Sequence, residues 1–166
     1  MSTAGRTIRD GVAVGLIGYA TVAIFYSLFD LLAARDPLYT VNMLGRAVFR
    51  GLRDPAVLQF PLSLDTGAVF LYNALHLGLA LAIGLTVAVL VAVGDRTPER
   101  RRKVRLIIAA GFVVTVGVVG LLTGAMRPVL PWWSIVVANA LSTVLGAVYL
   151  LAKRPGLWSR WIPRHA

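Results

Sequence analysis

Four long runs of apolar residues with almost no charge occupy most of the chain, at about residues 11–34, 66–94, 104–126 and 130–152. Each run reaches the roughly 20 residues that a helix needs to cross the hydrocarbon core of a bilayer. Their Val, Leu, Ala and Gly content does not alternate with polar residues, which argues against the strands of a membrane barrel. The sequence therefore predicts an all-α membrane protein, a single-domain bundle of four transmembrane helices over residues 1–166.

The basic residues are distributed unequally between the two sides of this predicted bundle. The N-terminus, the connection after residue 94 and the C-terminal tail contain twelve of the 17 Lys and Arg residues. The other two connections contain the remaining five, which are Arg35, Arg46, Arg50, Arg53 and Arg127. Because basic residues are retained on the cytoplasmic side, we expect both termini in the cytoplasm and the protein in a bacterial inner membrane. The net charge of +10 then reflects orientation, and no nucleic-acid partner is expected.

The flanks of the spans carry residues typical of membrane interfaces. A basic group precedes the third apolar run, and we expect it to contact anionic lipid headgroups: Arg100, Arg101, Arg102, Lys103 and Arg105. Four tryptophans flank the fourth span as expected interfacial anchors, Trp132 and Trp133 at its outer end and Trp158 and Trp161 at its inner end. Thr97 and Pro98 match an N-cap and a first helical position, so the third helix is expected to begin before its apolar run.

The long connection between the first two spans contains a further predicted helix, at about residues 42–53. Its apolar residues share one face and its arginines recur on another, as in an amphipathic helix. The apolar face comprises Met43, Leu44, Ala47, Val48 and Leu52, and Thr40 or Asn42 could cap the helix. We expect this helix to lie in the outer membrane–water interface with its apolar side facing the hydrocarbon core. It would act either as a lid or docking surface over the bundle, or simply as a cover for the helix ends.

Small residues recur at helical spacing in all four spans. In lipid, helices associate through close packing, which small residues permit. The clearest rows are Gly11, Gly15 and Gly18 in the first span, Ala80, Gly84 and Ala88 in the second, and Gly117, Gly120 and Gly124 in the third. These rows predict a compact four-helix bundle.

Polar side chains within the spans are the candidate functional residues, because an ionisable group in lipid costs about 2.5–3.5 kcal/mol at a helix centre. Asp30, Asn73, His76 and Asn139 fall at a similar depth in the outer half, and Tyr26 lies one helical turn from Asp30. We hypothesise that these residues form one polar cluster. An Asp near a His suits a proton relay, a ligand or cofactor site, or a purely structural hydrogen bond, and the sequence leaves these alternatives open.

Several kinds of chemistry lack the residues that they need. The chain has no cysteine, which excludes thiolate metal sites and thiol nucleophiles. His76 is the only histidine within a span, so a haem held by two histidines of one chain is excluded, whereas a single-histidine tetrapyrrole ligand at His76 is not. No Gly-x-Ser-x-Gly elbow, Walker loop or His-Glu-x-x-His motif occurs, so no enzyme class is indicated.

The sequence is compatible with two functions. The first is a structural or accessory subunit of a larger membrane assembly, with other membrane subunits or further copies of the chain as partners. The alternative is a ligand-binding, cofactor-binding or ion-translocating protein that uses the residues around Asp30 and His76. The two functions differ in one structural feature. A cavity that reaches the outer surface and is lined by these side chains favours binding, whereas a closed and dry cluster favours the accessory subunit.

Overall fold

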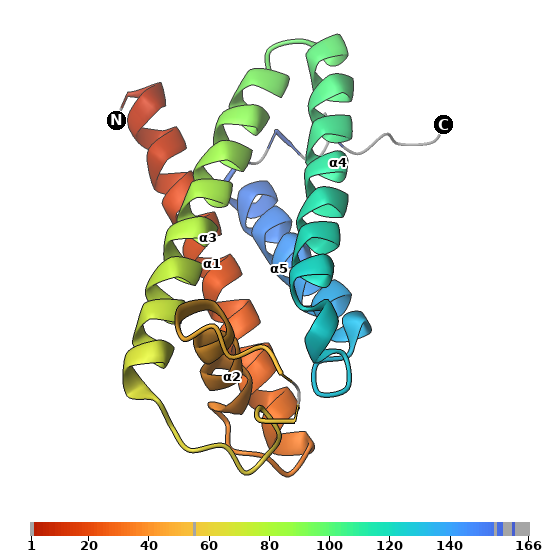
Figure 1. The fold of residues 1–166 in the computed structure, drawn as a ribbon. Helices are drawn as coiled ribbons and strands as arrows, with labels where there is room; N and C mark the ends of the chain where they lie inside the picture. Colours follow the sequence, from red (N-terminus) through yellow and green to blue (C-terminus); the bar gives the residue numbers. More distant parts are fainter. Residues whose placement is uncertain (1, 55, 155, 158–160, 162–166) are drawn as a thin grey trace.

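The computed structural model describes residues 2–54, 56–154, 156–157 and 161. Within these residues the chain is all-helical and contains no strand. The elements are α1 (Thr3–Leu32), α2 (Tyr39–Phe49), α3 (Thr66–Gly94), α4 (Pro98–Leu122), the short 3-10 helix η1 (Gly124–Met126) and α5 (Trp132–Lys153) (Figure 1). Helices α1, α3, α4 and α5 are long and apolar enough to cross a membrane, which agrees with the four predicted spans.

Three of the four long helices, α1, α3 and α4, begin at a residue whose side chain caps the helix. Helix α3 has the predicted bounds, and the Asp65 side chain accepts a hydrogen bond from the Ala68 N–H at its N-terminus. Helix α4 begins at Pro98 with Thr97 as its N-cap, as the sequence predicts. Helix α1 extends to Thr3, eight residues before its apolar run, because Ser2 caps it and accepts a hydrogen bond from the Gly5 N–H.

Helices α1 and α3 pack with their backbones in direct contact. A Cβ atom on Gly84 would collide with the Gly11 carbonyl oxygen and the Gly15 backbone, and one on Gly15 would lie 2.7 Å from the Leu81 Cα. Only glycine permits this approach. Helix α5 also packs on α1, since a Cβ on Gly18 of α1 would lie 3.0 Å from the Ser142 Oγ of α5. The predicted small-residue packing therefore forms around α1.

Helix α4 departs from the predicted compact bundle. Val104 is the only residue of this helix that is buried. Gly117 and Gly120 on α4 and Gly124 at the start of the adjoining η1 recur three and four residues apart, and a Cβ added at any of them would meet no atom within 4 Å. These glycines, called the α4 glycine face below, are not used for packing within the described chain.

Helix α2 differs from the predicted helix in its bounds and its surroundings. It spans Tyr39–Phe49 in place of residues 42–53, and neither Thr40 nor Asn42 is its N-cap, which is Leu38. Part of the predicted apolar face is buried, including Met43, whereas Val48 and Leu52 are exposed. Four residues of α2 pack against five from outside the helix in a core at the α2 end of the bundle. The residues of α2 are Tyr39, Met43, Leu44 and Ala47, and the others are Leu58, Met126, Val129, Leu130 and Ile135. Helix α2 is thus built into that end of the bundle.

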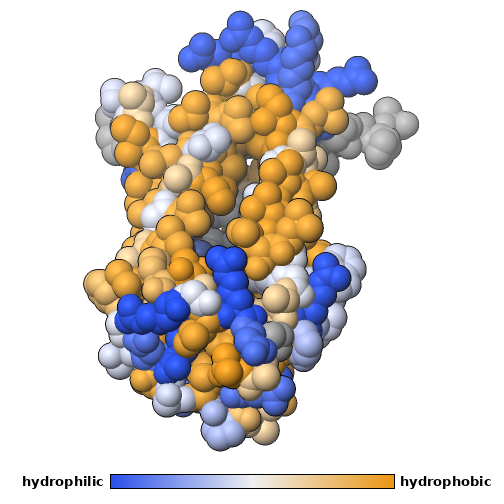
Figure 2. Space-filling model, in the orientation of Figure 1, coloured by the Kyte–Doolittle hydropathy of each residue, from blue (hydrophilic) through white to orange (hydrophobic). Residues whose placement is uncertain are grey.

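The two ends of the molecule are hydrophilic and the band between them is apolar on the face drawn in Figure 2. The start of α1 and the α3–α4 connection lie at one end, called the amino-terminal end here, and α2 lies at the other, called the α2 end (Figure 1). This arrangement is typical of a helical bundle whose middle is surrounded by lipid.

Candidate functional site

A cavity of about 100 Å³ lies where α1, α2 and α3 meet. It is called the α2 cavity below, because α2 and the residues just before it form one of its walls. Its lining residues are Val22, Ala23, Tyr26, Ser27, Asp30, Pro37, Leu38, Thr40, Val41, Leu44, Tyr72, Asn73 and His76. Four of the five predicted cluster residues are among them, which are Tyr26, Asp30, Asn73 and His76. Pro37 and Leu38 are exposed, so the cavity borders the surface at the α2 end.

Asp30 is completely buried and joins α1 to the N-terminus of α2. Its Oδ2 accepts a hydrogen bond from the Thr40 backbone N–H, and its Oδ1 accepts one from the Thr40 hydroxyl, both at 2.7 Å. The free N–H groups and positive dipole end of α2 favour a carboxylate at this position. Asp30 therefore caps α2 from a neighbouring helix, and Leu38, the N-cap, makes no side-chain hydrogen bond of its own.

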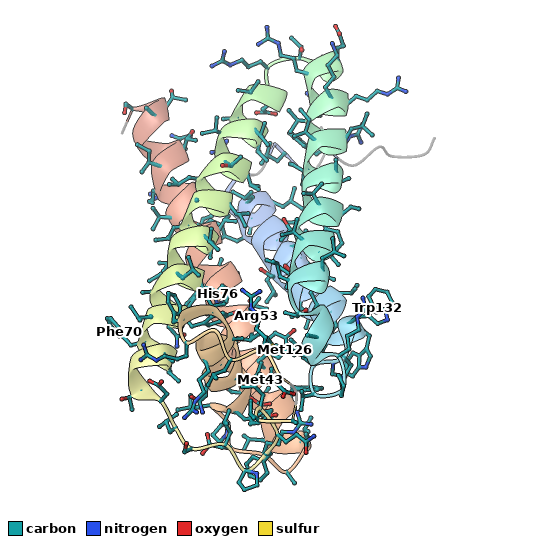
Figure 3. All side chains as sticks on the ribbon, in the orientation of Figure 1. Met43, Arg53, Phe70, His76, Met126 and Trp132 are labelled. Atoms are coloured by element: carbon teal, nitrogen blue, oxygen red, sulfur yellow. The ribbon has the colours of Figure 1, made fainter. Side chains whose placement is uncertain are left out.

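His76 lies between two tyrosine rings on the α3 side of the cavity, on the part of α3 shown in Figure 3. Its ring centroid is 5.2 Å from that of Tyr19 and 6.2 Å from that of Tyr72. No hydrogen bond from its imidazole is found among the residues that the structure describes. Asp30 and His76 thus line one cavity, but the hydrogen-bond partner of Asp30 is Thr40.

Asn73 lies one helical turn from His76 and is positioned by α1. Its Oδ1 accepts a hydrogen bond from the Tyr19 hydroxyl at 2.9 Å, and its Nδ2 donates to the Val69 carbonyl at 2.9 Å. The sequence analysis did not single out Tyr19. Its position within the first span could have indicated it, because a tyrosine hydroxyl buried there needs a hydrogen-bond partner.

Tyr26 and Asn139 face different surroundings. Tyr26 lines the cavity, and its hydroxyl lies 3.4 Å from the Ser134 Oγ. Asn139 does not line the cavity, and its Nδ2 donates to the Ile135 carbonyl within α5 at 2.8 Å. The structure brings the other four predicted residues together without it.

Polar contacts fix α2 to the start of α3. Asn42 donates from Nδ2 to the Ser63 carbonyl and accepts from the Asp65 N–H, each at 3.0 Å. Arg46 donates to the Ser63 carbonyl and hydroxyl oxygens. Arg50 pairs with Asp65 through Nε at 3.0 Å. Five residues on the two sides of the contact, Asn42, Arg46, Arg50, Ser63 and Asp65, are therefore joined by polar contacts, and α2 is attached along its length.

Asp65 and Tyr39, at the α2 end, have shifted pKa values. The Arg50 guanidinium, helped by the Ala68 N–H, lowers the pKa of the Asp65 carboxyl from 3.8 to about 2. Burial raises the pKa of Tyr39, whose hydroxyl donates to the Leu58 carbonyl at 2.7 Å. Both shifts belong to groups that hold the α2 end together.

The α2 cavity does not fit a tetrapyrrole. Sites for small organic ligands commonly measure about 300–1,000 Å³, several times the volume beside His76. Within the described residues no group of three or more His, Asp or Glu side chains could hold a metal ion. The chemistry available in the cavity is hydrogen bonding, one carboxylate charge and aromatic surface.

The predicted basic residues lie on the first turns of α4, at the amino-terminal end (Figure 2). Lys103 pairs with Glu99 at 2.9 Å, and Arg105 donates to the Trp161 carbonyl at 3.2 Å. Arg100, Arg102, Lys103 and Arg105 are exposed, and Arg101 is half-buried.

The predicted tryptophan anchors have different surroundings. Trp132 and Trp133 are exposed at the start of α5, and Trp132 is labelled in Figure 3. Trp161 is half-buried and packs against Gly94, where an added Cβ would lie 3.0 Å from its ring. Trp161 is therefore a packing residue at the end of α3. Trp158 lies outside the described residues.

A buried ion pair at the amino-terminal end was missed by the sequence analysis. Asp10 is 1% exposed, and Arg154 donates to its Oδ2 from Nε at 3.0 Å and from Nη2 at 2.8 Å. The pair joins the first turns of α1 to the residue after α5. Asp10 directly precedes the first apolar run, outside the span in which the sequence analysis looked for polar residues.

Comparison of the chain with models of protein families, with curated proteins and with solved structures gives no significant match.

Proposed function

We propose that this chain is a multi-pass protein of a bacterial inner membrane, with both termini in the cytoplasm, that binds a small polar ligand in the α2 cavity. Four helices that are long and apolar enough to span a membrane support the first part. The excess of Lys and Arg at the amino-terminal end supports the orientation, since basic residues are retained on the cytoplasmic side. The α2 end then faces the outside.

The observation that carries the binding function is the lining of the α2 cavity. Of the two functions that the sequence predicts, binding requires the polar residues of the spans to surround a space near the outer surface. Asp30, Asn73 and His76 do so, beside the exposed Pro37 and Leu38. Intramembrane ionisable residues that face a cavity are typical of substrate and ion sites.

The binding function requires water to reach the cavity, and cysteine chemistry can test this. The chain has no cysteine, so a single introduced thiol is the only reactive one. Ser27 lines the cavity, whereas Ile24 on the same helix is 60% exposed at the apolar surface. Methanethiosulfonates react with thiolates, which form in water and not in lipid. We expect externally added methyl methanethiosulfonate to modify Ser27→Cys at least tenfold faster than Ile24→Cys, and equal slow rates would refute an aqueous site.

The accessory-subunit function remains a second candidate, and helix α4 is the observation that favours it. This helix buries one residue, and the α4 glycine face is uncovered. Such a face permits the close approach of a helix from another subunit. A photo-cross-linker on Gly117→Cys should then give a protein adduct in native membranes, whereas one on Ile83→Cys, exposed on α3, should not. Adducts with lipid alone at Gly117→Cys would reject this function.

We also propose roles in the membrane for α2 and the predicted interfacial residues. The exposed side of α2 would lie in the outer interface, where Val48 and Leu52 would meet lipid. The exposed Arg100 and Arg102 would contact anionic headgroups on the cytoplasmic side. Trp132 and Trp133 would anchor α5 at the outer interface, in agreement with their exposure.

A further inference from the structure

The α2 cavity has a consistent chemical character. It is small, it contains a single carboxylate, and no Lys or Arg is among its thirteen lining residues. The nearest basic side chain in sequence, Arg35, is directed elsewhere. Its Nη1 donates to the Val129 carbonyl at 3.1 Å, and its guanidinium lies 4.9 Å from the centre of the Tyr39 ring. The only formal charge on the cavity wall is therefore negative.

Three side chains on the cavity wall also keep hydrogen-bond acceptor positions that none of the recorded hydrogen bonds of the described residues uses. A carboxylate offers about four acceptor positions, and Thr40 uses two of those of Asp30. The Asn73 Oδ1 accepts one bond, from Tyr19, and retains a second lone pair. The His76 imidazole has no hydrogen-bond partner among the described residues, and a neutral imidazole has one acceptor nitrogen. Three acceptors of different kinds are thus available to one guest.

Aromatic surface lies beside these acceptors. Tyr26 and Tyr72 both line the cavity, one from α1 and one from α3. The face of a phenol ring attracts a cation through its quadrupole. A cation placed over the face of either ring would therefore be favoured by the ring as well as by Asp30.

We infer that the α2 cavity binds a small protonated amine, ammonium or a short primary alkylammonium ion, between Asp30, Asn73 and His76. This inference rests on the proposed binding function and names its ligand class. The N–H groups of such an ion can donate to all three acceptors, whereas the described residues contain no group of three or more His, Asp or Glu side chains for a metal ion. A water molecule occupies about 30 Å³ in the liquid, so about 100 Å³ holds roughly three water-sized groups. Ethylammonium, with three heavy atoms, is therefore the largest ligand expected to fit.

The experiment is a thermal-unfolding titration of the full chain in nanodiscs of phosphatidylcholine, a lipid without net charge. Methylammonium chloride replaces sodium chloride at constant ionic strength, and potassium and tetramethylammonium chlorides serve as matched salts. Potassium is close to ammonium in size but has no N–H group, and tetramethylammonium has a charge but no N–H group. A ligand that binds only the folded chain raises its Tm. We expect methylammonium and ammonium to raise the Tm, and the two matched salts to leave it unchanged.

The variant that decides the assignment is His76→Leu. Because the imidazole has no hydrogen-bond partner among the described residues, this variant loses none of the recorded hydrogen bonds and should fold. It should weaken methylammonium binding at least tenfold, and Asn73→Leu should weaken it as well. Asp10→Asn, which removes the other buried carboxylate, should leave the apparent Kd within twofold, since Asp10 lies at the opposite end and pairs with Arg154.

Two results overturn the inference. Equal Tm shifts with methylammonium and potassium would reject an amine site, as would an unchanged response of His76→Leu. A ligand of another class is indicated if Ser27→Cys reacts from outside and potassium or neutral formamide raises the Tm of the wild type but not that of His76→Leu. If Ser27→Cys is inert and no solute stabilises the chain, the proposed binding function fails together with the amine.

Discussion

Both carboxylate oxygens of Asp30 accept hydrogen bonds from one residue, Thr40, across the contact between α1 and α2. The Asp30 side chain thereby closes the N-terminus of a helix to which it does not belong. It also contributes the charge of the α2 cavity. One side chain therefore links the position of α2 to the chemistry of the candidate site.

Removal of the Thr40 hydroxyl should cost stability through this pair. Thr40→Val leaves one oxygen of a buried carboxylate without its donor, and a hydrogen bond to a charged group contributes about 1.5–3 kcal/mol. We expect a loss of about 1.5 kcal/mol or more in the free energy of unfolding, measured by steric trapping in bicelles. The loss should largely disappear in the Asp30→Asn background, as coupling within one pair requires.

Asn139→Leu is the matched control for this measurement. Its side chain donates to a carbonyl of its own helix and joins no second helix, whereas even the hydrogen bonds that join two helices in membranes average only about 0.6 kcal/mol. We expect a change no larger than that. A Thr40→Val variant as stable as the wild type would show that the Asp30–Thr40 pair does not hold α2.

Gly84 and Gly78, both on α3, should respond in opposite ways to the same substitution. Gly84→Ala places a Cβ against the Gly11 carbonyl and the Gly15 backbone, which cannot yield as a side chain can. Overpacking of this kind costs about 1–3 kcal/mol, and we expect the upper part of that range. Gly78→Ala meets no atom within 4 Å and should be neutral or slightly stabilising, by up to about 1 kcal/mol. Equal destabilisation of both variants would contradict the α1–α3 backbone contact.

The pH dependence of stability should carry the signature of Asp65. Its folded pKa of about 2 lies below the ordinary 3.8, so the Arg50–Asp65 pair stabilises the fold above pH 4. This stabilisation is lost as pH falls from about 4 to 2, because a carboxyl with a lowered pKa binds its proton less readily in the folded chain. The stability difference between wild type and Asp65→Asn should therefore be constant above pH 5 and shrink toward pH 2. A constant difference down to pH 2 would show that Asp65 is not paired with Arg50.

The spans could be predicted from the sequence because they depend on local properties. Run length and absence of charge define α3 at its observed bounds, and Thr97 with Pro98 defines the start of α4. Asp30 and His76 were recognisable as costly groups in lipid before any partner was known. These features could be predicted without knowing which distant parts of the chain they contact.

The position of α2 could not be predicted in this way, because its surroundings are set by distant residues. Asn42 finds its partners at Ser63 and Asp65, about twenty positions along the chain. The periodicity of Met43 and Leu44 showed an apolar face but not whether lipid or protein covers it. Likewise, the α4 glycine face and the packed glycines of α1 both recur at spacings of three and four, and only the structure shows which of the two rows is covered by another helix.

The orientation of the chain in the membrane is the claim on which the outer position of the α2 cavity depends, and cysteine labelling in intact cells measures it. Gln59, in the connection between α2 and α3, and Arg102, on the first turns of α4, are both exposed. Gln59 adjoins Leu58 in the core of the α2 end, whereas the start of α4 belongs to the amino-terminal end. A membrane-impermeant maleimide should label Gln59→Cys in intact spheroplasts and Arg102→Cys only after the membrane is disrupted. Labelling of Arg102→Cys in intact spheroplasts, with Gln59→Cys protected, would contradict the orientation and place the cavity on the cytoplasmic side.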